Sequence, residues 1–193
     1  MTRTVDFNQE KILDKAMLVF WQKGYEKTSL QDLLQATGIS RSSLYNTFND
    51  KAHLFTACVA HYRKKKAFRK EILLNACNVK EGLREYFKQR IAASYSSPLG
   101  CLITNTAVED ILLPESLKPE VDALVQDQFT ELEKIFFDLL EKGKQSGEIA
   151  ASVDIKAQAF LFLNLNHSIN VMAKANMGRS DVEHMVENVI YNL

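Results

Sequence analysis

Cysteine, proline and glycine are all scarce in this 193-residue sequence, which contains three, three and seven of them. The cysteines, Cys58, Cys77 and Cys101, form no C-x-x-C pair, which argues against a disulfide framework or a zinc cluster and favours a reducing compartment. Charges interrupt every apolar run before the roughly 18 residues that a membrane-spanning helix needs, and the first residues lack an apolar signal core. We therefore expect a cytoplasmic protein with no membrane span.

The scarcity of helix-breaking residues leaves long stretches in which apolar residues recur at helical spacing, without a strand-like alternation. This pattern predicts an all-α fold of about nine helices. Gly24 is expected to stop the first helix, and Pro114 and Pro119 to bound a loop. Thr28 or Ser29, then Ser40, Asp50, Asp154 and Ser180, are expected to cap helices. The expected ranges are 7–23, 30–36, 41–48, 51 into the 70s, 79–96, 101–112, 121–145, 155 to about 176, and 181 to the C-terminus.

Positive charge is concentrated in the first third, although the whole chain is formally neutral. Residues 1–70 contain 13 Lys or Arg and 6 Asp or Glu, a balance of +7, and the remaining 123 residues have a balance of −7. A basic first third on an acidic body is consistent with one part that faces a polyanion, and equally with a solvated basic surface.

Residues 28–48, TSLQDLLQATGISRSSLYNTF, have the pattern of a helix–turn–helix around Gly38. Leu44 and Phe48 are four residues apart and should share the buried face of the second helix, which turns Ser42 and Asn46 outward. Arginine and asparagine can pair with guanine and adenine edges in the major groove, and hydroxyl and lysine side chains suit phosphates. The alternative is a helical-core motif that binds no DNA.

The same stretch resembles the DNA-binding signature of the TetR (tetracycline-repressor-like) family, and the resemblance covers about residues 9–55. It rests on Phe20, Gly24, Tyr25 and Thr28, on Leu33-x-x-Ala36-x-Gly38-Ile39-Ser40, on Leu44-Tyr45-x-x-Phe48, and on Lys51 with Leu54. It implies a three-helix helix–turn–helix DNA-binding domain at 1–52 and a helical ligand-sensing and dimerisation domain at 53–193. The implied phosphate contacts are Thr28, Ser43, Tyr45 and Lys51; the implied base readers are Arg41, Ser42 and Asn46, with Thr47 beside them. Ser42, Asn46 and Thr47 differ from common relatives, so the DNA sequence that is read cannot be transferred.

By the same resemblance, the last two helices form a homodimer interface and the preceding ones enclose a small-molecule pocket. The sequence supports the dimer independently, because IKAQAFLFLNLNHSINVMAKA is apolar almost all round. Polar and aromatic residues in the apolar stretches are candidate pocket residues, although most aromatic residues at helical spacing simply fill a core. The candidates are Tyr86, Arg90, Cys101, Asn105, Phe129, Phe136, Asn164 and His167.

The segment GCLITNTAVED, residues 100–110, resembles a G-C-L-x-x-N-x-A-x-E segment of one branch of the family. Cys101 is expected near a helix N-terminus, where the helix dipole favours a thiolate, so it is a candidate redox or electrophile sensor. The alternative is a small buried residue that packs a hinge.

An enzyme is disfavoured, because the sequence has no Gly-rich phosphate loop, no supported Ser–His–Asp arrangement and no metal-spaced histidines. A thiol enzyme using Cys101 and His167 stays conceivable, and a purely structural module would leave the basic third unexplained. We expect no cofactor and no metal. The expected partners are a palindromic double-stranded DNA operator, a small-molecule, electrophile or oxidant signal that releases a repressor from it, and a second copy of the chain.

Overall fold

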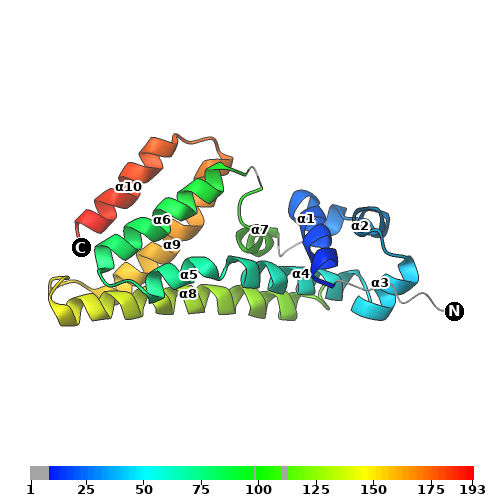
Figure 1. Cartoon of the computed structure of the whole chain (residues 1–193), viewed down its shortest axis with the longest axis horizontal. Helices are drawn as coiled ribbons and strands as arrows, with labels where there is room; N and C mark the ends of the chain where they lie inside the picture. The colour runs from blue at the N-terminus through cyan, green and yellow to red at the C-terminus, as the bar shows by residue number, and fades with distance from the viewer. Residues whose placement is uncertain (1–8, 98, 110–112) are drawn as a thin grey trace. The chain divides into compact units, whose positions relative to one another are not determined.

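A computed structural model describes residues 9–97, 99–109 and 113–193. Within these ranges the chain forms ten α-helices and no β-strand, which confirms the all-α prediction. None of the described helices combines the length and the apolar character needed to cross a membrane. The helices (Figure 1) are α1 Gln9–Lys27, α2 Leu30–Thr37, α3 Arg41–Phe48, α4 Lys51–Lys66, α5 Phe68–Leu74, α6 Val79–Tyr95, α7 Leu102–Glu109, α8 Lys118–Ser146, α9 Ile155–Lys174 and α10 Arg179–Tyr191.

The chain folds into two compact units. The first contains the described residues up to Lys65 together with those between Asn105 and Leu124, and the second contains 66–104 and 125–193. Helices α1 to α3 lie in the first unit, and α5, α6, α9 and α10 lie in the second. The predicted functional boundary between residues 52 and 53 is not tested by this packing and stays a prediction.

The capping and glycine residues of the sequence predicted the bounds of the first three helices closely. Gly24 was predicted to stop the first helix, and it does leave helical geometry, with φ 75° and ψ 169°. Helical residues follow this kink, so α1 extends to Lys27. The predicted start at residue 7 lies outside the described residues. Ser29, rather than Thr28, caps α2: its Oγ accepts a hydrogen bond from the Asp32 N–H, and the Asp32 carboxylate accepts one from the Ser29 N–H. This reciprocal pair is a capping box, which satisfies two N–H groups at the helix start.

The region predicted as one long helix from residue 51 into the 70s is two helices, α4 and α5. The chain turns at Ala67, whose φ of −58° and ψ of −30° stay in the right-handed helical region. The Lys70 N–H donates to the Ala67 carbonyl, a tighter bond than the four-residue spacing of an α-helix. The described residues therefore form one helix more than the roughly nine that the sequence predicted.

Three predicted helix starts, those of α7, α8 and α10, also differ from the structure. Pro119 does not bound a loop but lies in the first turn of α8, where its missing N–H removes no helical hydrogen bond. Helix α10 begins at Arg179 after Gly178, which makes no side-chain cap, so the predicted cap Ser180 lies inside the helix. Helix α7 begins at Leu102, one residue after the predicted start, and its predicted end at residues 110–112 lies outside the described residues.

The first unit is held by aromatic packing between α1 and α4. The Phe20 ring meets Phe55 edge-on with centroids 5.1 Å apart, and Tyr25 meets the same Phe55 ring at 5.1 Å. His61 Nε2 lies 2.8 Å from Asp14 Oδ1, which also accepts a hydrogen bond from Lys65 at 2.7 Å. These contacts hold α4 against α1 within the first unit.

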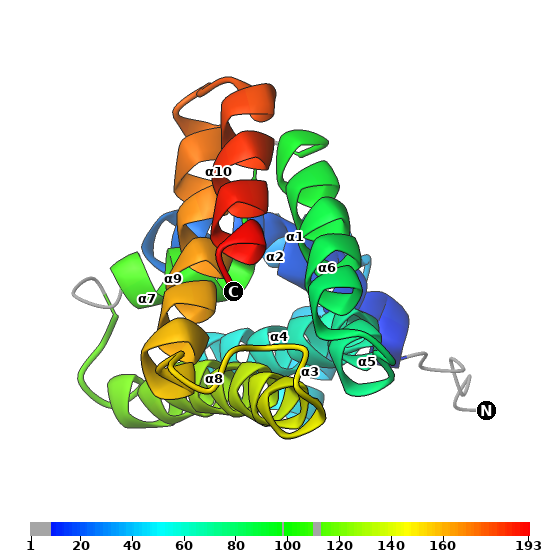
Figure 2. The ribbon, with the colours of Figure 1, turned by 90° about the vertical axis from the view of Figure 1, so that its left-hand side faces the viewer.

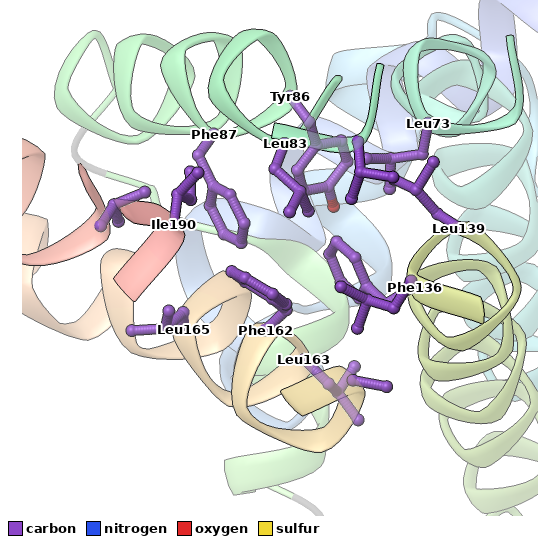
Figure 3. Packing of buried hydrophobic residues seen from close by; sticks show 14 of the residues in the cluster. Leu73, Leu83, Tyr86, Phe87, Phe136, Leu139, Phe162, Leu163, Leu165 and Ile190 are labelled. Carbon is purple, nitrogen blue, oxygen red and sulfur yellow. The ribbon is translucent and has the colours of Figure 1, made fainter. Parts of the chain in front are cut away.

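The second unit has a core in which α6 packs against α5, α9 and α10. Figure 2 shows α6, α9 and α10 side by side as three neighbouring rods. The rings of Phe87, Phe136 and Phe162 meet at the centre, with centroids 5.7–5.9 Å apart, and all three side chains are fully buried. In Figure 3 these rings converge from three different helices, with Tyr86 directed into the same space. Of the aromatic candidates for the pocket, Tyr86 and Phe136 thus belong to this core, and Phe129 packs against it.

Candidate nucleic-acid interface

A tight turn between α2 and α3 positions α3. One residue at each end of this turn defines its geometry. Gly38 adopts the left-handed conformation, with φ 75° and ψ 14°, and its N–H donates to the Leu34 carbonyl. Ser40 then caps α3, since its Oγ accepts a hydrogen bond from the Ser43 N–H at 3.1 Å. The helix–turn–helix predicted from these residues is therefore present.

The two faces of α3 differ as the four-residue spacing predicted. Leu44 and Phe48 are buried and anchor the helix in the first unit. Arg41, Ser42, Asn46 and Thr47 are exposed on the other side. This helix thus presents polar side chains with one guanidinium, and it contains no acidic residue.

The exposed side chains at the start of α3 contact one another. The Arg41 guanidinium lies 5.6 Å from the centroid of the Tyr45 ring, and 40 % of Tyr45 is exposed. The hydroxyls of Ser42 and Ser43 each lie 2.9 Å from the Ser40 hydroxyl. The three hydroxyls carry three protons and their two mutual contacts use two of them, so one proton remains to donate to a phosphate oxygen.

Lys51 and Thr28 flank this face in different ways. The Lys51 ammonium lies 4.2 Å from the centroid of the Tyr25 ring, and partial burial lowers the pKa of Lys51 despite the nearby Glu26 carboxylate. Thr28 is buried: its hydroxyl donates to the Gly24 carbonyl at 2.6 Å, and its N–H donates to the Tyr25 carbonyl. Of the eight predicted DNA-binding residues, Thr28 alone is not on the accessible surface.

Part of the positive charge of the first third is paired within that unit. Lys23 bonds to Asp32 at 2.7 Å, Lys65 bonds to Asp14, and Lys64 lies 3.6 Å from Glu10. These pairs join α1 to α2 and α4. Since α3 itself contains no carboxylate, its surface keeps the positive sign that a phosphate backbone requires.

The predicted ligand-binding residues differ in how deeply they are buried. Tyr86, Arg90 and Phe136 are buried, and Cys101, Phe129 and His167 are partly buried. Asn164 is exposed and its Nδ2 donates to the Phe160 carbonyl of its own helix. Asn105 belongs to the first unit, whereas the other seven belong to the second.

Four polar partners of these residues were missed from the sequence: Ser94, Thr104, Asn166 and Asn170. The Asn166 amide oxygen accepts hydrogen bonds from the Tyr86 hydroxyl and from Arg90 Nε, both at 2.9 Å. The Thr104 hydroxyl lies 3.1 Å from His167 Nδ1. Polar residues four apart, at 90 and 94 and at 166 and 170, were the available signal, because such pairs share one face of an otherwise apolar helix.

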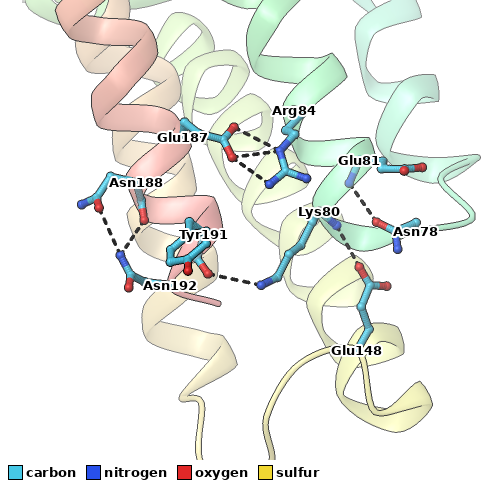
Figure 4. A network of polar contacts seen from close by, with 9 residues as sticks. All are labelled: Asn78, Lys80, Glu81, Arg84, Glu148, Glu187, Asn188, Tyr191 and Asn192. Carbon is cyan, nitrogen blue, oxygen red and sulfur yellow. Dashed lines mark hydrogen bonds and ion pairs between the residues drawn. The ribbon is translucent and has the colours of Figure 1, made fainter.

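A groove of about 230 Å³ lies between α6 and α10 in the second unit. Its charged walls are already paired, since the Arg84 guanidinium makes a two-oxygen contact with the Glu187 carboxylate (Figure 4). Glu183 bonds to Arg179 and Lys88 lies 3.6 Å from Glu85. The Arg84–Glu187 ion pair therefore joins α6 to α10 across the groove. Each charged side chain that lines the groove has an oppositely charged partner, so the groove offers no unpaired charge to a ligand.

Comparisons with known proteins agree with this geometry. The model of bacterial regulatory proteins of the tetR family matches residues 12–58, and that of the tetracyclin repressor-like C-terminal domain matches residues 80–189. An uncharacterized HTH-type transcriptional regulator of Bacillus subtilis, YezE, is 34% identical over 100% of this chain and 98% of its own length. The HTH-type transcriptional repressor ComR of Escherichia coli is 33% identical over 77% of this chain and 71% of its own length.

A solved structure shares the fold over nearly the whole chain. A cysteine mutant of the TetR family transcriptional regulator CifR, in complex with 26-bp double-strand operator DNA, superimposes with a TM-score of 0.84. It is 28% identical, and the match covers 98% of both chains. The two family models, these relatives and the helix–turn–helix together show that this chain belongs to the TetR family of DNA-binding transcriptional regulators, which are not enzymes.

Proposed function

We propose that the protein is a homodimeric, cytoplasmic repressor that binds a palindromic operator and leaves it on a chemical signal. The observation that carries this proposal is the outer face of α3, which presents Arg41, Ser42 and Asn46 without any acidic neighbour on the helix. ComR is named a repressor, and the CifR structure contains operator DNA, which supports the same role for this chain.

Within this proposal, the residues of α3 have two tasks. Arg41, Ser42 and Asn46 read base edges, with Thr47 beside them, because arginine and asparagine side chains can make paired hydrogen bonds to guanine and adenine. Ser43, Tyr45 and Lys51 contact phosphates, which set the position of the helix on the duplex. The direct phosphate contact predicted for Thr28 stays a prediction, and its internal hydrogen bonds point to support of the turn before α2.

The proposed dimer uses α9 and α10. Phe160 and Val171 of α9 are 57% and 60% exposed, and Leu161 and Met177 are also exposed. Phe160 and Val171 lie about three helical turns apart on one face of α9, with Asn164 between them, so this face presents two large apolar side chains to solvent. A second copy of the same face would cover it, and two recognition helices would then read two half-sites.

The proposed signal is a small molecule, an electrophile or an oxidant. A signal that binds more tightly to the form unable to fit both half-sites shifts the population away from DNA. Cys101 directly precedes α7 and is partly buried, and Gly100 before it has a φ of 71°. We propose that the segment 100–110 marks the branch of the family that it resembles. This position is compatible with two roles, sensing by Cys101 or packing by a small residue.

Peroxide treatment separates these two possibilities. If Cys101 is the sensor, its thiolate attacks one oxygen of hydrogen peroxide, the O–O bond breaks with loss of hydroxide, and a sulfenic acid forms. Operator affinity then falls in the wild type but not in Cys101→Ser. Gel shifts and intact mass measure the two effects in parallel. Cys77→Ser is the matched control, since Cys77 is exposed in the second unit; Cys58 is buried, which raises its pKa and makes it unreactive. Equal release from the wild type and Cys101→Ser would leave Cys101 only its packing role.

The experiment that tests the proposal as a whole is selection of genomic fragments by the purified full chain. We expect the bound fragments to share an inverted repeat, with half-site centres about one helical turn of DNA apart. Fragments without a common motif would contradict the proposal.

A further inference from the structure

Arg90 of α6 carries a buried positive charge that has no counter-ion in the part of the chain that the structure describes. Only 6% of the residue is exposed. Its Nε donates to Asn166 Oδ1 and its Nη1 donates to Ser94 Oγ, both at 2.9 Å, and neither partner is charged. Its Nη2 is buried without a hydrogen-bond partner among the described residues. A buried charge is costly unless it is paired, so this arrangement calls for an anion.

Two further polar groups of α9 are left unpaired beside this charge. Asn170 is 1% exposed; its Oδ1 lies 3.1 Å from the same Ser94 hydroxyl that Arg90 bonds, while its Nδ2 has no partner among the described residues. His167 Nε2 is likewise unpaired in the described part of the chain. Residues 167 and 170 are three apart, so their side chains leave the helix on neighbouring positions of one face.

The protonation state of His167 determines whether its unpaired Nε2 is a hydrogen-bond donor. Burial, and to a smaller extent the positive charge of Arg90, lower the pKa of His167 to about 4. The imidazole is therefore neutral at pH 7, and when the Thr104 hydroxyl donates to Nδ1, the ring proton resides on Nε2. Arg90, Asn170 and His167 then offer three N–H groups, one of them charged.

Three hydrogen-bond donors and one net positive charge favour a ligand that has acceptor atoms and a negative charge. A bridging water could satisfy an amide, but it would leave the guanidinium without a counter-charge. A cation would be repelled, and a carboxylate offers two acceptor oxygens and one negative charge. The Phe129 ring, whose centroid lies 4.1 Å from that of His167, adds an apolar surface beside the donors.

We infer that the second unit binds a small organic carboxylate with an apolar body, held by Arg90, Asn170 and His167. This inference rests on the proposed ligand-responsive function and names the chemical class of the signal. The paired charges of the groove between α6 and α10 provide a contrast, because there each cation already has its carboxylate.

The first test measures thermal unfolding and calorimetric binding of the full chain with octanoate and benzoate, against the neutral octanamide and benzamide. We expect at least one carboxylate to raise the unfolding temperature while its amide does not. Arg90→Gln should weaken the apparent Kd by about 30-fold or more, as expected when a buried charge partner is removed. Arg84→Gln, the same change on the same helix, should bind like the wild type. Equal effects of amides and carboxylates, no effect of either carboxylate, or unchanged binding by Arg90→Gln would overturn the inference.

A second variant keeps the test independent of the probe and of the folding of Arg90→Gln. Asn170→Asp places a carboxylate beside Arg90, so it should raise the unfolding temperature of the ligand-free protein and abolish the response to octanoate and benzoate. A lowered unfolding temperature at neutral pH would contradict the inference. Gel shifts separate the two levels of proposal: operator binding without a carboxylate response refutes the carboxylate site alone. Arg90-dependent carboxylate binding without operator release refutes the effector role, while the binding site stands.

Discussion

Replacing Arg41 and Tyr45 together by alanine is expected to abolish operator binding and leave the helical circular dichroism unchanged. The two side chains lie against each other at the start of α3, and both are exposed, so their removal creates no cavity in the core. A paired arginine–guanine contact contributes about 1–3 kcal/mol to discrimination, and a dimer makes it twice. The expected loss is therefore about 2–6 kcal/mol before the Tyr45 contact is counted, which exceeds about 30-fold in affinity.

The measurement is a competition gel shift with an operator fragment taken from the genomic selection. Lys142→Ala is the control, because it also removes one positive charge from an exposed position, but in the second unit. We expect the control to bind like the wild type. Operator binding by the Arg41→Ala, Tyr45→Ala variant at wild-type affinity would remove α3 as the reading helix.

Placing two carboxylates on the exposed face of α9, by Phe160→Asp with Val171→Asp, is expected to convert the dimer to a monomer. Both positions are more than half exposed in the single chain, so the substitutions should leave its own core intact. In a symmetric interface each substitution occurs twice, and four carboxylates would have to be desolvated together. Operator affinity should fall with dimerisation, because one short recognition helix reads few bases.

Light scattering after size-exclusion chromatography gives the mass directly. Gln126→Asp with Gln145→Asp is the control, since it adds the same two charges at exposed positions of α8. It should keep the mass of a dimer of this 22.0-kDa chain. A dimeric Phe160→Asp, Val171→Asp variant would show that another surface joins the copies.

The parts of the fold that local chemistry determines were predictable from the sequence. Ser40, Gly38 and the four-residue spacing of Leu44 and Phe48 defined α3 with its correct bounds, because capping and amphipathic spacing act within a few residues. The break at Ala67 has no glycine or proline to announce it, and α10 starts without a side-chain cap. Such features depend on packing that a local pattern does not contain.

The polar network of the second unit shows the same limit. Arg90 and Asn166 are 76 residues apart in the chain, and Tyr86 and Asn166 are 80 apart. The sequence marked Tyr86, Arg90 and His167 as unusual in apolar helices, but it could not pair them with Asn166 or reveal which donors stay unpaired. Only the packing of α6 against α9 brings these groups together.

The salt dependence of operator affinity tests the central claim most directly. Fluorescence anisotropy of a labelled operator duplex, and of a scrambled duplex of equal length, would be measured between 50 and 200 mM salt. If Arg41 and Lys51 of both copies meet phosphates or bases, four positive charges displace counter-ions, and affinity should fall by about 100-fold or more over this range. The operator should be preferred over the scrambled duplex throughout. Affinity that is independent of salt, or equal for the two duplexes, would contradict a specific DNA-binding role for the α3 surface.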